Sequence, residues 1–300
     1  MTTMLQLVQQ ATAELGLGVP NAVAGNTATD VVQILALLNA VGNELQRLHE
    51  WQALDIEYRF TAQYLETTGD TTTNSAVITN MASTAGLDGT YMVTGNGVPQ
   101  DTYVLSNDSA TQVTLTQALT STATGETITF TKTKYTFPAD YDRMVNRTNW
   151  DKTNHWEMIG PESAQQWQWL KSGYIQTTPR VRYRQLGGTF QIWPPIGASN
   201  YYGFEYISKN WVLDASGNGK SSFTADDDTC IFPDRLMVLG LKLKYFEIKG
   251  FETTALYRDY IYQFDSAKSM DAGAATLSLS GNREALLIGY ESIPDSGFGR

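Results

Sequence analysis

The chain has 300 residues, of which 42% are hydrophobic and 17% are charged, and its formal net charge is −10. This length and apolar content suffice for a hydrophobic core of ordinary size, in one large domain or two smaller ones. Proteins that bind nucleic acids usually carry a basic surface patch, and the net negative charge of this chain therefore argues against a sequence-specific DNA-binding protein. An acidic surface would instead suit the wall of a channel through which DNA slides without sticking.

The charged fraction is low compared with the roughly 25% of average globular proteins. One interpretation is that another protein covers much of the surface. The other is a β-rich secreted protein whose surface is polar but uncharged. Composition leaves both open.

The residues that most often build reactive or metal sites are scarce. Cys230 is the single cysteine, which excludes an intrachain disulfide and a cysteine-based metal site. His49 and His155 are too few for a histidine cluster. The N-terminus lacks a basic region followed by an apolar run, and no stretch of 18 apolar residues occurs. We therefore expect folding in the cytoplasm of the producing cell, no membrane span and no cofactor.

Two amphipathic helices are predicted near the N-terminus. The first covers Thr3–Leu15 and ends at Gly16. The second begins near Thr27 and Asp30, which have capping-box spacing. Its apolar seam advances in alternating steps of three and four: Val31, Ile34, Leu38, Val41, Leu45 and Leu48. Further apolar residues widen this face, which fits either a core helix of a bundle or a helix between the body and an adjacent subunit.

The composition changes abruptly after a predicted strand at Ile56–Phe60. From Thr61 to Thr131 the chain carries no Lys or Arg, and Thr, Ser, Asn and Gly dominate. Five short β-patterned runs bounded by turn residues follow one another: SAVIT, GTYMVTG, TYVLS, TQVTLTQ and ETITFT. We predict a small all-β insertion over residues 66–134, which interrupts an α+β host formed by residues 1–65 and 135–272.

The host continues with a short helix and an antiparallel sheet. The helix lies in PESAQQWQWLKSG, where Pro161 suits the first turn and Glu162 the positive end of the helix dipole. Strands are predicted at Arg180–Leu186, Thr189–Trp193 and Gly203–Ser208, and two glycines between the first two indicate a hairpin turn.

Two further helices are predicted before the C-terminal tail. The first runs from Pro233 to Lys249 with Gly250 as its C-cap. It carries two apolar rows: Leu236, Leu239, Leu243 and Phe246, and Val238, Leu241, Tyr245 and Ile248. The second covers about Glu252 to Met270. From Gly273 the periodicity dissolves, which predicts a segment that is disordered or that becomes ordered on a partner.

No strong catalytic or metal-binding motif occurs, so we predict no enzyme activity and no catalytic, cofactor or metal site. The run Asp226–Asp228 lacks the spacing of a calcium loop and is predicted to be a solvated turn before a helix. His155 lies near Asp151 and Glu157, but its surroundings indicate a strand-loop-strand surface without a nameable nucleophile.

Aromatic residues are concentrated in the second half of the chain: Trp150, Trp156, Trp167, Trp169, Trp193, Tyr201, Tyr202, Tyr206 and Trp211. They could fill the core of the predicted sheet. They could equally form a surface that contacts another subunit or a sugar, because Trp and Tyr are enriched at interfaces.

Several host segments carry a family resemblance. In chain order they are LQRLHEWQAL, FPADYDRMVNRTNWD, GPESAQQWQWLKSG, RQLGGTFQIWPP, FEYISKNWVLD and FPDRLMVLGLKLKYFEIKG. Together they resemble tailed-phage adaptor proteins, the tail-accessory or head-completion subunits that bind under the portal. The resemblance covers most of residues 1–60 and 135–275, and the insertion departs from the minimal pattern.

The resemblance implies a structural subunit of the virion neck or tail. Such subunits form a homo-oligomeric ring of about twelve copies under the portal protein. The ring extends the channel through which double-stranded DNA passes without specific binding, and it offers a platform for tail tube, nozzle or fibre proteins. The helices would then pack the ring through Val31, Ile34, Leu38, Val41, Leu45, Leu48, Leu236, Leu239, Leu243 and Phe246.

The resemblance also implies that residues 273–300 form an extended C-terminal arm that binds the portal. Its apolar contacts would come from Leu277, Leu279, Leu286, Leu287, Ile288, Tyr290, Ile293 and Phe298. Two alternatives remain open. Carboxylates near Asp140–Asp151 could belong to a tail-associated cell-wall hydrolase, and the insertion could be a glycan-binding tail module.

Overall fold

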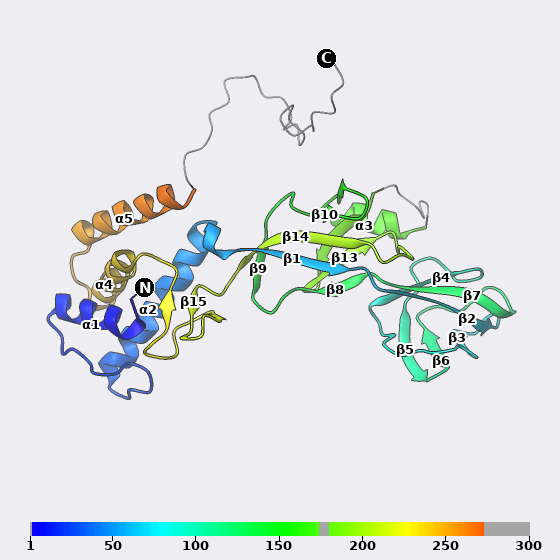
Figure 1. Cartoon of the computed structure of the whole chain (residues 1–300), viewed down its shortest axis with the longest axis horizontal. Helices are drawn as coiled ribbons and strands as arrows, with labels where there is room; N and C mark the ends of the chain where they lie inside the picture. The colour runs from blue at the N-terminus through cyan, green and yellow to red at the C-terminus, as the bar shows by residue number, and fades with distance from the viewer. Residues whose placement is uncertain (1, 174–179, 273–300) are drawn as a thin grey trace, which may run out of the picture.

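The computed structural model describes residues 2–173 and 180–272. Within them the chain forms five α-helices and several small antiparallel sheets, so the predicted α+β class is confirmed (Figure 1). Four helices gather at one end of the long axis, aromatic-rich sheets occupy the middle, and a small β unit lies at the other end. None of the described helices combines the length and apolar character needed to cross a membrane.

The helices at one end pack around a central helix. They are α1 (Met4–Leu15), α2 (Thr29–Leu48), α4 (Asp234–Lys249) and α5 (Thr254–Ala272). Helix α4 contacts each of the other three, and its apolar residues from Leu236 to Leu243 are buried. We call this group the helical unit. The four helices match the predicted ones to within a few residues.

The start of α2 differs from the sequence prediction. The capping box predicted for α2 is wrong, because the residue before its first turn is Ala28, which has no side-chain acceptor. Thr27 lies outside the helix and Asp30 within its first turn. A capping box forms instead at α1, where Thr3 accepts a hydrogen bond from the Gln6 amide at 3.4 Å and the Gln6 side chain accepts one from the Thr3 amide at 3.1 Å.

The predicted antiparallel sheet is two sheets. One contains β1 (Asp55–Thr61), β14 (Tyr201–Ser208), β10 (Trp150–Asp151), β11 (Trp156–Glu157) and β9 (Tyr141–Met144). The other contains β12 (Arg182–Leu186), β13 (Thr189–Trp193) and β8 (Lys134–Thr136). The predicted β12–β13 hairpin is confirmed, with φ of 58° and 71° at Gly187 and Gly188. Strand β14 pairs with β1, about 150 residues earlier in the chain, which local patterns could not indicate.

Helix α3 (Ala164–Lys171) forms inside the predicted segment but starts later than expected. Ser163 caps it by accepting a hydrogen bond from the Gln166 amide at 3.2 Å. Pro161 therefore does not occupy the first turn. Glu162 does not serve the helix dipole either, because it accepts a hydrogen bond from Arg182 of β12 at 2.6 Å.

The β unit at the far end consists of two three-stranded sheets. They contain β2 (Tyr64–Thr71), β7 (Ala123–Lys132) and β4 (Tyr91–Gly95), and β3 (Val77–Ile78), β6 (Gln112–Leu115) and β5 (Val104–Ser109). Strands form in all five predicted runs, and β2 is an additional one. The β unit has a hydrophobic core of its own, in which four side chains are fully buried: Ile78, Val113, Ile128 and Phe130.

The β unit also packs on the rest of the chain. Met92 of β4 is buried together with Trp167, Leu170 and Trp193 from α3 and β13. Lys171 of α3 forms an ion pair with Asp101 at 2.8 Å. The division of the chain into domains at residues 66 and 134 stays a prediction.

The remaining elements connect the sheets to the helices. A short 3-10 turn, η1 (Gln52–Leu54), joins α2 to β1. A small sheet of β15 (Val212–Leu213), β16 (Gly219–Lys220) and β17 (Thr229–Cys230) lies against the helical unit.

Candidate functional site

The apolar seams of α2 and α4 lie largely inside the subunit. Seven of the ten residues assigned to ring packing are at most 5% exposed: Ile34, Leu38, Val41, Leu45, Leu236, Leu239 and Leu243. Val31 and Phe246 are partly buried, and Leu48 is 60% exposed. The buried side chains hold the helices of one subunit together. That any of the ten contacts a neighbouring subunit stays a prediction.

Two glycines set the close approach of these helices. A Cβ on Gly240 of α4 would lie 2.6 Å from Val41 and 3.1 Å from Tyr260. A Cβ on Gly42 of α2 would overlap the ring of Trp211, which is fully buried. The interlock leaves little freedom to re-orient α2 or α4 within the subunit.

Large apolar side chains remain exposed on the outside of the helical unit. We call them the helical surface: Val32, Leu48, Ile248, Phe251, Tyr257, Tyr262 and Met270, each at least 50% exposed. They lie on α2, on α5, at the end of α4 and, for Phe251, in the connection between α4 and α5. Aromatic residues and Met are enriched where proteins contact one another, so these side chains are candidates for such contacts. Sequence reasoning placed the seams correctly but did not separate this outer set from the buried one.

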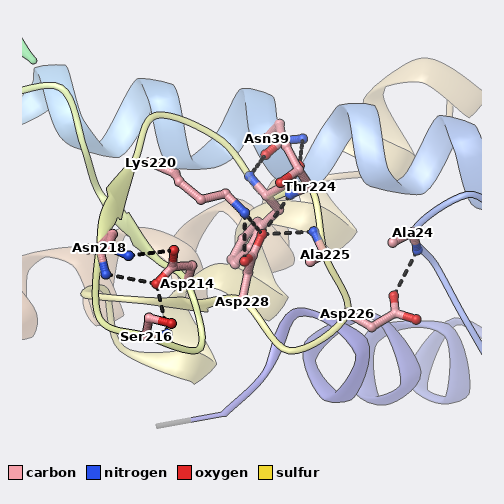
Figure 2. Close-up of polar contacts among 11 residues, drawn as sticks. Ala24, Asn39, Asp214, Ser216, Asn218, Lys220, Thr224, Ala225, Asp226 and Asp228 are labelled. Atoms are coloured by element: carbon pink, nitrogen blue, oxygen red, sulfur yellow. Dashed lines mark hydrogen bonds and ion pairs between the residues drawn. The ribbon is translucent and has the colours of Figure 1, made fainter. Parts of the chain in front are cut away.

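The acidic run before α4 is a structural junction (Figure 2). The predicted turn is present and Asp227 is exposed in it, but the prediction that the whole run is solvated is wrong, because Asp228 is buried. Asp228 is fully buried and accepts hydrogen bonds from Lys220 at 2.7 and 2.6 Å. It also accepts the Thr224 and Ala225 amides at 2.7 and 2.8 Å. Burial raises the pKa of Asp228, but these hydrogen bonds outweigh it and hold the pKa below its ordinary value.

Neighbouring residues tie the same loop to distant segments. Asp226 accepts hydrogen bonds from the Val23 and Ala24 amides at 2.9 and 2.8 Å. The Asn39 side chain of α2 accepts a hydrogen bond from the Phe223 amide at 2.8 Å. The carboxylates thus serve backbone donors of the fold, and no group of acidic, His or Cys residues among the described ones is arranged to hold a metal ion.

The His155 region forms the predicted strand-loop-strand surface, the β10–β11 hairpin. Asp151 is buried and accepts the Thr153 and Asn154 amides, both at 3.0 Å, so it shapes the hairpin. A hollow of about 560 Å³ beside it is lined by residues that include Glu57 and His155. Hydrogen bonds from Arg59 and Lys152 lower the pKa of Glu57 to about 2. Glu57 is therefore an ionised partner of two cations and poorly suited to donate a proton.

The aromatic residues divide between core and surface. Trp167, Trp193, Tyr202, Tyr206 and Trp211 are buried, and Trp150 is partly buried. Trp156, Trp169 and Tyr201 are exposed by 43%, 42% and 36%. Core filling therefore accounts for most of the concentration, and three of these side chains are exposed at the surface.

The residues assigned to a C-terminal arm lie outside the described residues. They are Leu277, Leu279, Leu286, Leu287, Ile288, Tyr290, Ile293 and Phe298. What the structure does place is their point of departure, the end of α5 at Ala272.

Comparison with known proteins supplies the family. No curated protein matches the chain. A family model described as SU10 adaptor protein matches residues 99–283. The match begins within the β unit and continues through the central sheets, apart from β1, and through α3, α4 and α5. Because it covers more than half of the chain, the protein belongs to the SU10 adaptor protein family of phage head-to-tail adaptors.

Proposed function

We propose that this adaptor is a structural subunit of a ring under the portal protein of a tailed phage. The ring, of about twelve copies, extends the DNA channel and carries the tail tube, nozzle or fibre proteins. The subunit is made in the host cytoplasm and resides in the neck or tail of the virion. The observation that carries the proposal is the family match over residues 99–283.

The helical surface supports a role in assembly. Apart from Phe251, its residues lie on helices that bury other residues in the subunit's own core, so a second partner can cover these side chains without disturbing the fold. The net charge of −10 supports a channel that repels DNA phosphates. We propose that the helical surface makes ring contacts, while the buried seams act only by shaping the subunit.

A deletion tests the proposed portal-binding arm. Removing residues 274–300 should leave a folded protein that no longer docks to the portal, because the deletion begins after α5 ends at Ala272 and leaves the helical unit and the sheets intact. Mass measurement of the protein with and without purified portal checks this. We expect the full chain to change from monomer to a portal-bound ring of about twelve copies, and the truncated chain to stay monomeric.

As the control, circular dichroism and thermal unfolding should show that the truncated chain is folded as the full chain is. Normal docking by the truncated chain would contradict the arm, and a stable dimer without portal would count against the ring.

The hydrolase alternative gains no support from the carboxylates that suggested it. Asp140 accepts hydrogen bonds from Tyr206 at 2.9 Å and Ser208 at 2.7 Å. Asp142 accepts hydrogen bonds from Gln46 and Arg143. Both are occupied by fold contacts, as is Asp151. Zymography on the purified protein remains the decisive measurement, and bands abolished by one carboxylate substitution would overturn the structural role.

The glycan-binding alternative for the insertion is equally unsupported. Sugar sites rely on exposed aromatic faces. Between residues 66 and 134 the aromatic residues are Tyr91, Tyr103 and Phe130; the first and last are buried and Tyr103 is partly buried. Lys134 lies over the Tyr103 ring, 4.0 Å from its centroid, and covers it further. A glycan array probed with the full chain should therefore be blank.

A further inference from the structure

The sequence contains the tripeptide Gly-Asn-Gly twice, around Asn96 and around Asn218. The first lies in the turn after β4 and the second at the start of β16. Asparagine followed by glycine is the usual site of deamidation, because glycine has no Cβ to shield its backbone nitrogen from the preceding side-chain amide. Both asparagines are exposed. Local sequence and solvent access therefore predict equal reactivity at the two sites.

The second site is tied to a carboxylate (Figure 2). The Asn218 backbone amide and side-chain Nδ2 donate hydrogen bonds to the Asp214 carboxylate at 2.8 and 3.0 Å. The Asn218 carbonyl accepts one from the Asp214 amide at 2.9 Å. The hydrogen bonds from Asn218 hold the pKa of Asp214 below its ordinary value, so the carboxylate is ionised at neutral pH. In deamidation Nδ2 must leave as ammonia, and here Nδ2 is bound to a charged acceptor.

The first site has no such restraint. None of the described residues makes a hydrogen bond with the Asn96 side chain or with the Gly97 nitrogen. Gly97 is held through its carbonyl, which accepts hydrogen bonds from the Thr120 amide at 2.8 Å and the Thr120 hydroxyl at 3.1 Å. The two groups that react in deamidation, the Gly97 nitrogen and the Asn96 side-chain amide, are therefore both unbonded.

The turn also requires the glycine that makes Asn96 reactive. The φ of Gly97 is 74°, in the left-handed region that favours glycine. A Cβ at this position would overlap the Ser121 side chain. Replacing Gly97 by a residue that shields its nitrogen would therefore disturb the turn.

We propose that Asn96 is a site of spontaneous deamidation in the folded protein, and that Asp214 protects Asn218 from the same reaction. The Gly97 nitrogen forms a bond to Asn96 Cγ, and the Cγ–Nδ2 bond breaks. Ammonia leaves with the proton of the Gly97 nitrogen, and a cyclic succinimide remains. Water then adds to one of the two ring carbonyls. Opening at Cγ gives aspartate, and opening at the backbone carbonyl carbon gives isoaspartate.

The product changes the charge and the backbone of the β unit. Residues 66–131 contain six acidic residues and no Lys or Arg, and the reaction adds one more carboxylate. An isoaspartate also lengthens the turn by one backbone atom, just before Val98, which packs against the core of the β unit. Asp101, which forms the ion pair with Lys171 of α3, follows in the same loop. The modification therefore alters the β unit next to its contact with α3.

Peptide mass spectrometry of the full chain, incubated at neutral pH, tests the proposal. We expect Asn96 to gain one mass unit about tenfold faster than Asn218, because at Asn218 a hydrogen bond to an ionised carboxylate must break first. In guanidinium chloride, where both tripeptides are unfolded, the two rates should be similar. Labelling by an isoaspartyl methyltransferase should appear at position 96 and be lost from that position in Asn96→Ala.

Substitution of Asp214 tests the protection separately. In Asp214→Ala the rate at Asn218 should rise toward the rate at Asn96, because Nδ2 loses its acceptor. Asp214→Asn keeps the size of the side chain but offers an uncharged acceptor, so it should give an intermediate rate. The rate at Asn96 should be the same in all three chains and serves as the internal standard. Circular dichroism checks that each variant is folded.

Two results would overturn the assignment of Asn96. They are equal or slower deamidation at Asn96 than at Asn218 in the folded chain, and reaction of Asn96 only in guanidinium chloride. An unchanged rate at Asn218 in Asp214→Ala would overturn the protective role of Asp214. All of these measurements use the free protein, so they do not depend on the portal or the ring.

Discussion

Asp228→Ala should lower the free energy of unfolding by about 3 kcal/mol, at the lower end of the range for breaking a buried ion pair. Asp228 is fully buried, and its carboxylate is the shared acceptor for Lys220 and two backbone amides. Alanine leaves these donors without their partner. The Lys220 side chain is 26% exposed and can regain some hydration, which limits the loss. Chemical denaturation at pH 7 measures the change.

Asp227→Ala is the matched control. Asp227 belongs to the same run but is exposed, so its removal should change the free energy of unfolding by less than about 0.5 kcal/mol. A loss as small for Asp228→Ala would mean that the junction in Figure 2 contributes little to stability.

The contribution of Asp228 should depend on pH in a defined direction. Its pKa is lower in the folded protein than the ordinary value of 3.8. The unfolded chain therefore takes up its proton at a higher pH than the folded one, and the stabilisation is complete well above pH 3.8. It is lost as the pH falls through the lower, folded value. The stability difference between wild type and Asp228→Ala should be constant from about pH 7 to 5 and shrink below about pH 4.

The helices and most strands were predictable from local patterns. The helical period locates α1, α2, α4 and α5, since each must bury one apolar stripe whatever its partner is. Gly16 and Gly250 also mark where α1 and α4 end. The alternation in the insertion likewise locates its strands. These signals depend on residues within one or two turns of each other. They do not say which elements meet, and for that reason the two central sheets were predicted as one.

The role of the acidic run was not predictable for a related reason. Asp226 binds amides of Val23 and Ala24, about 200 residues away in the chain, and Asp228 depends on the turn that brings Lys220 over it. A run of three carboxylates is usually solvated, so sequence favoured the wrong prediction. The helical surface shows the same limit. Leu48 and Leu45 belong to one seam, yet only the packing of α4 and β14 around α2 decides which is buried.

Gly42→Ala should destabilise the protein by about 2 kcal/mol, although alanine favours helices over glycine by about 1 kcal/mol. The added Cβ would lie closer than 3.0 Å to three ring atoms of Trp211. The indole cannot move aside easily. Its ring centroid lies 5.1 Å from that of Phe223, edge-on, and 5.8 Å from that of Phe232, stacked. Its Nε1 donates a hydrogen bond to the Asn43 side-chain oxygen at 3.0 Å. Overpacking a confined site costs up to about 3 kcal/mol, which exceeds the gain in helix propensity.

A double-mutant cycle distinguishes this clash from a general effect of the substitution. Trp211→Phe alone should destabilise by leaving a cavity, but its smaller ring makes room for the new methyl group. Gly42→Ala and Trp211→Phe together should therefore cost less than the sum of the two, by about 1 kcal/mol or more. Gly18→Ala is the control, because nothing lies within 4 Å of its added Cβ. Additive costs in the cycle would show that Trp211 yields at no expense, and that α2 is held against the small sheet less tightly than the close approach at Gly42 indicates.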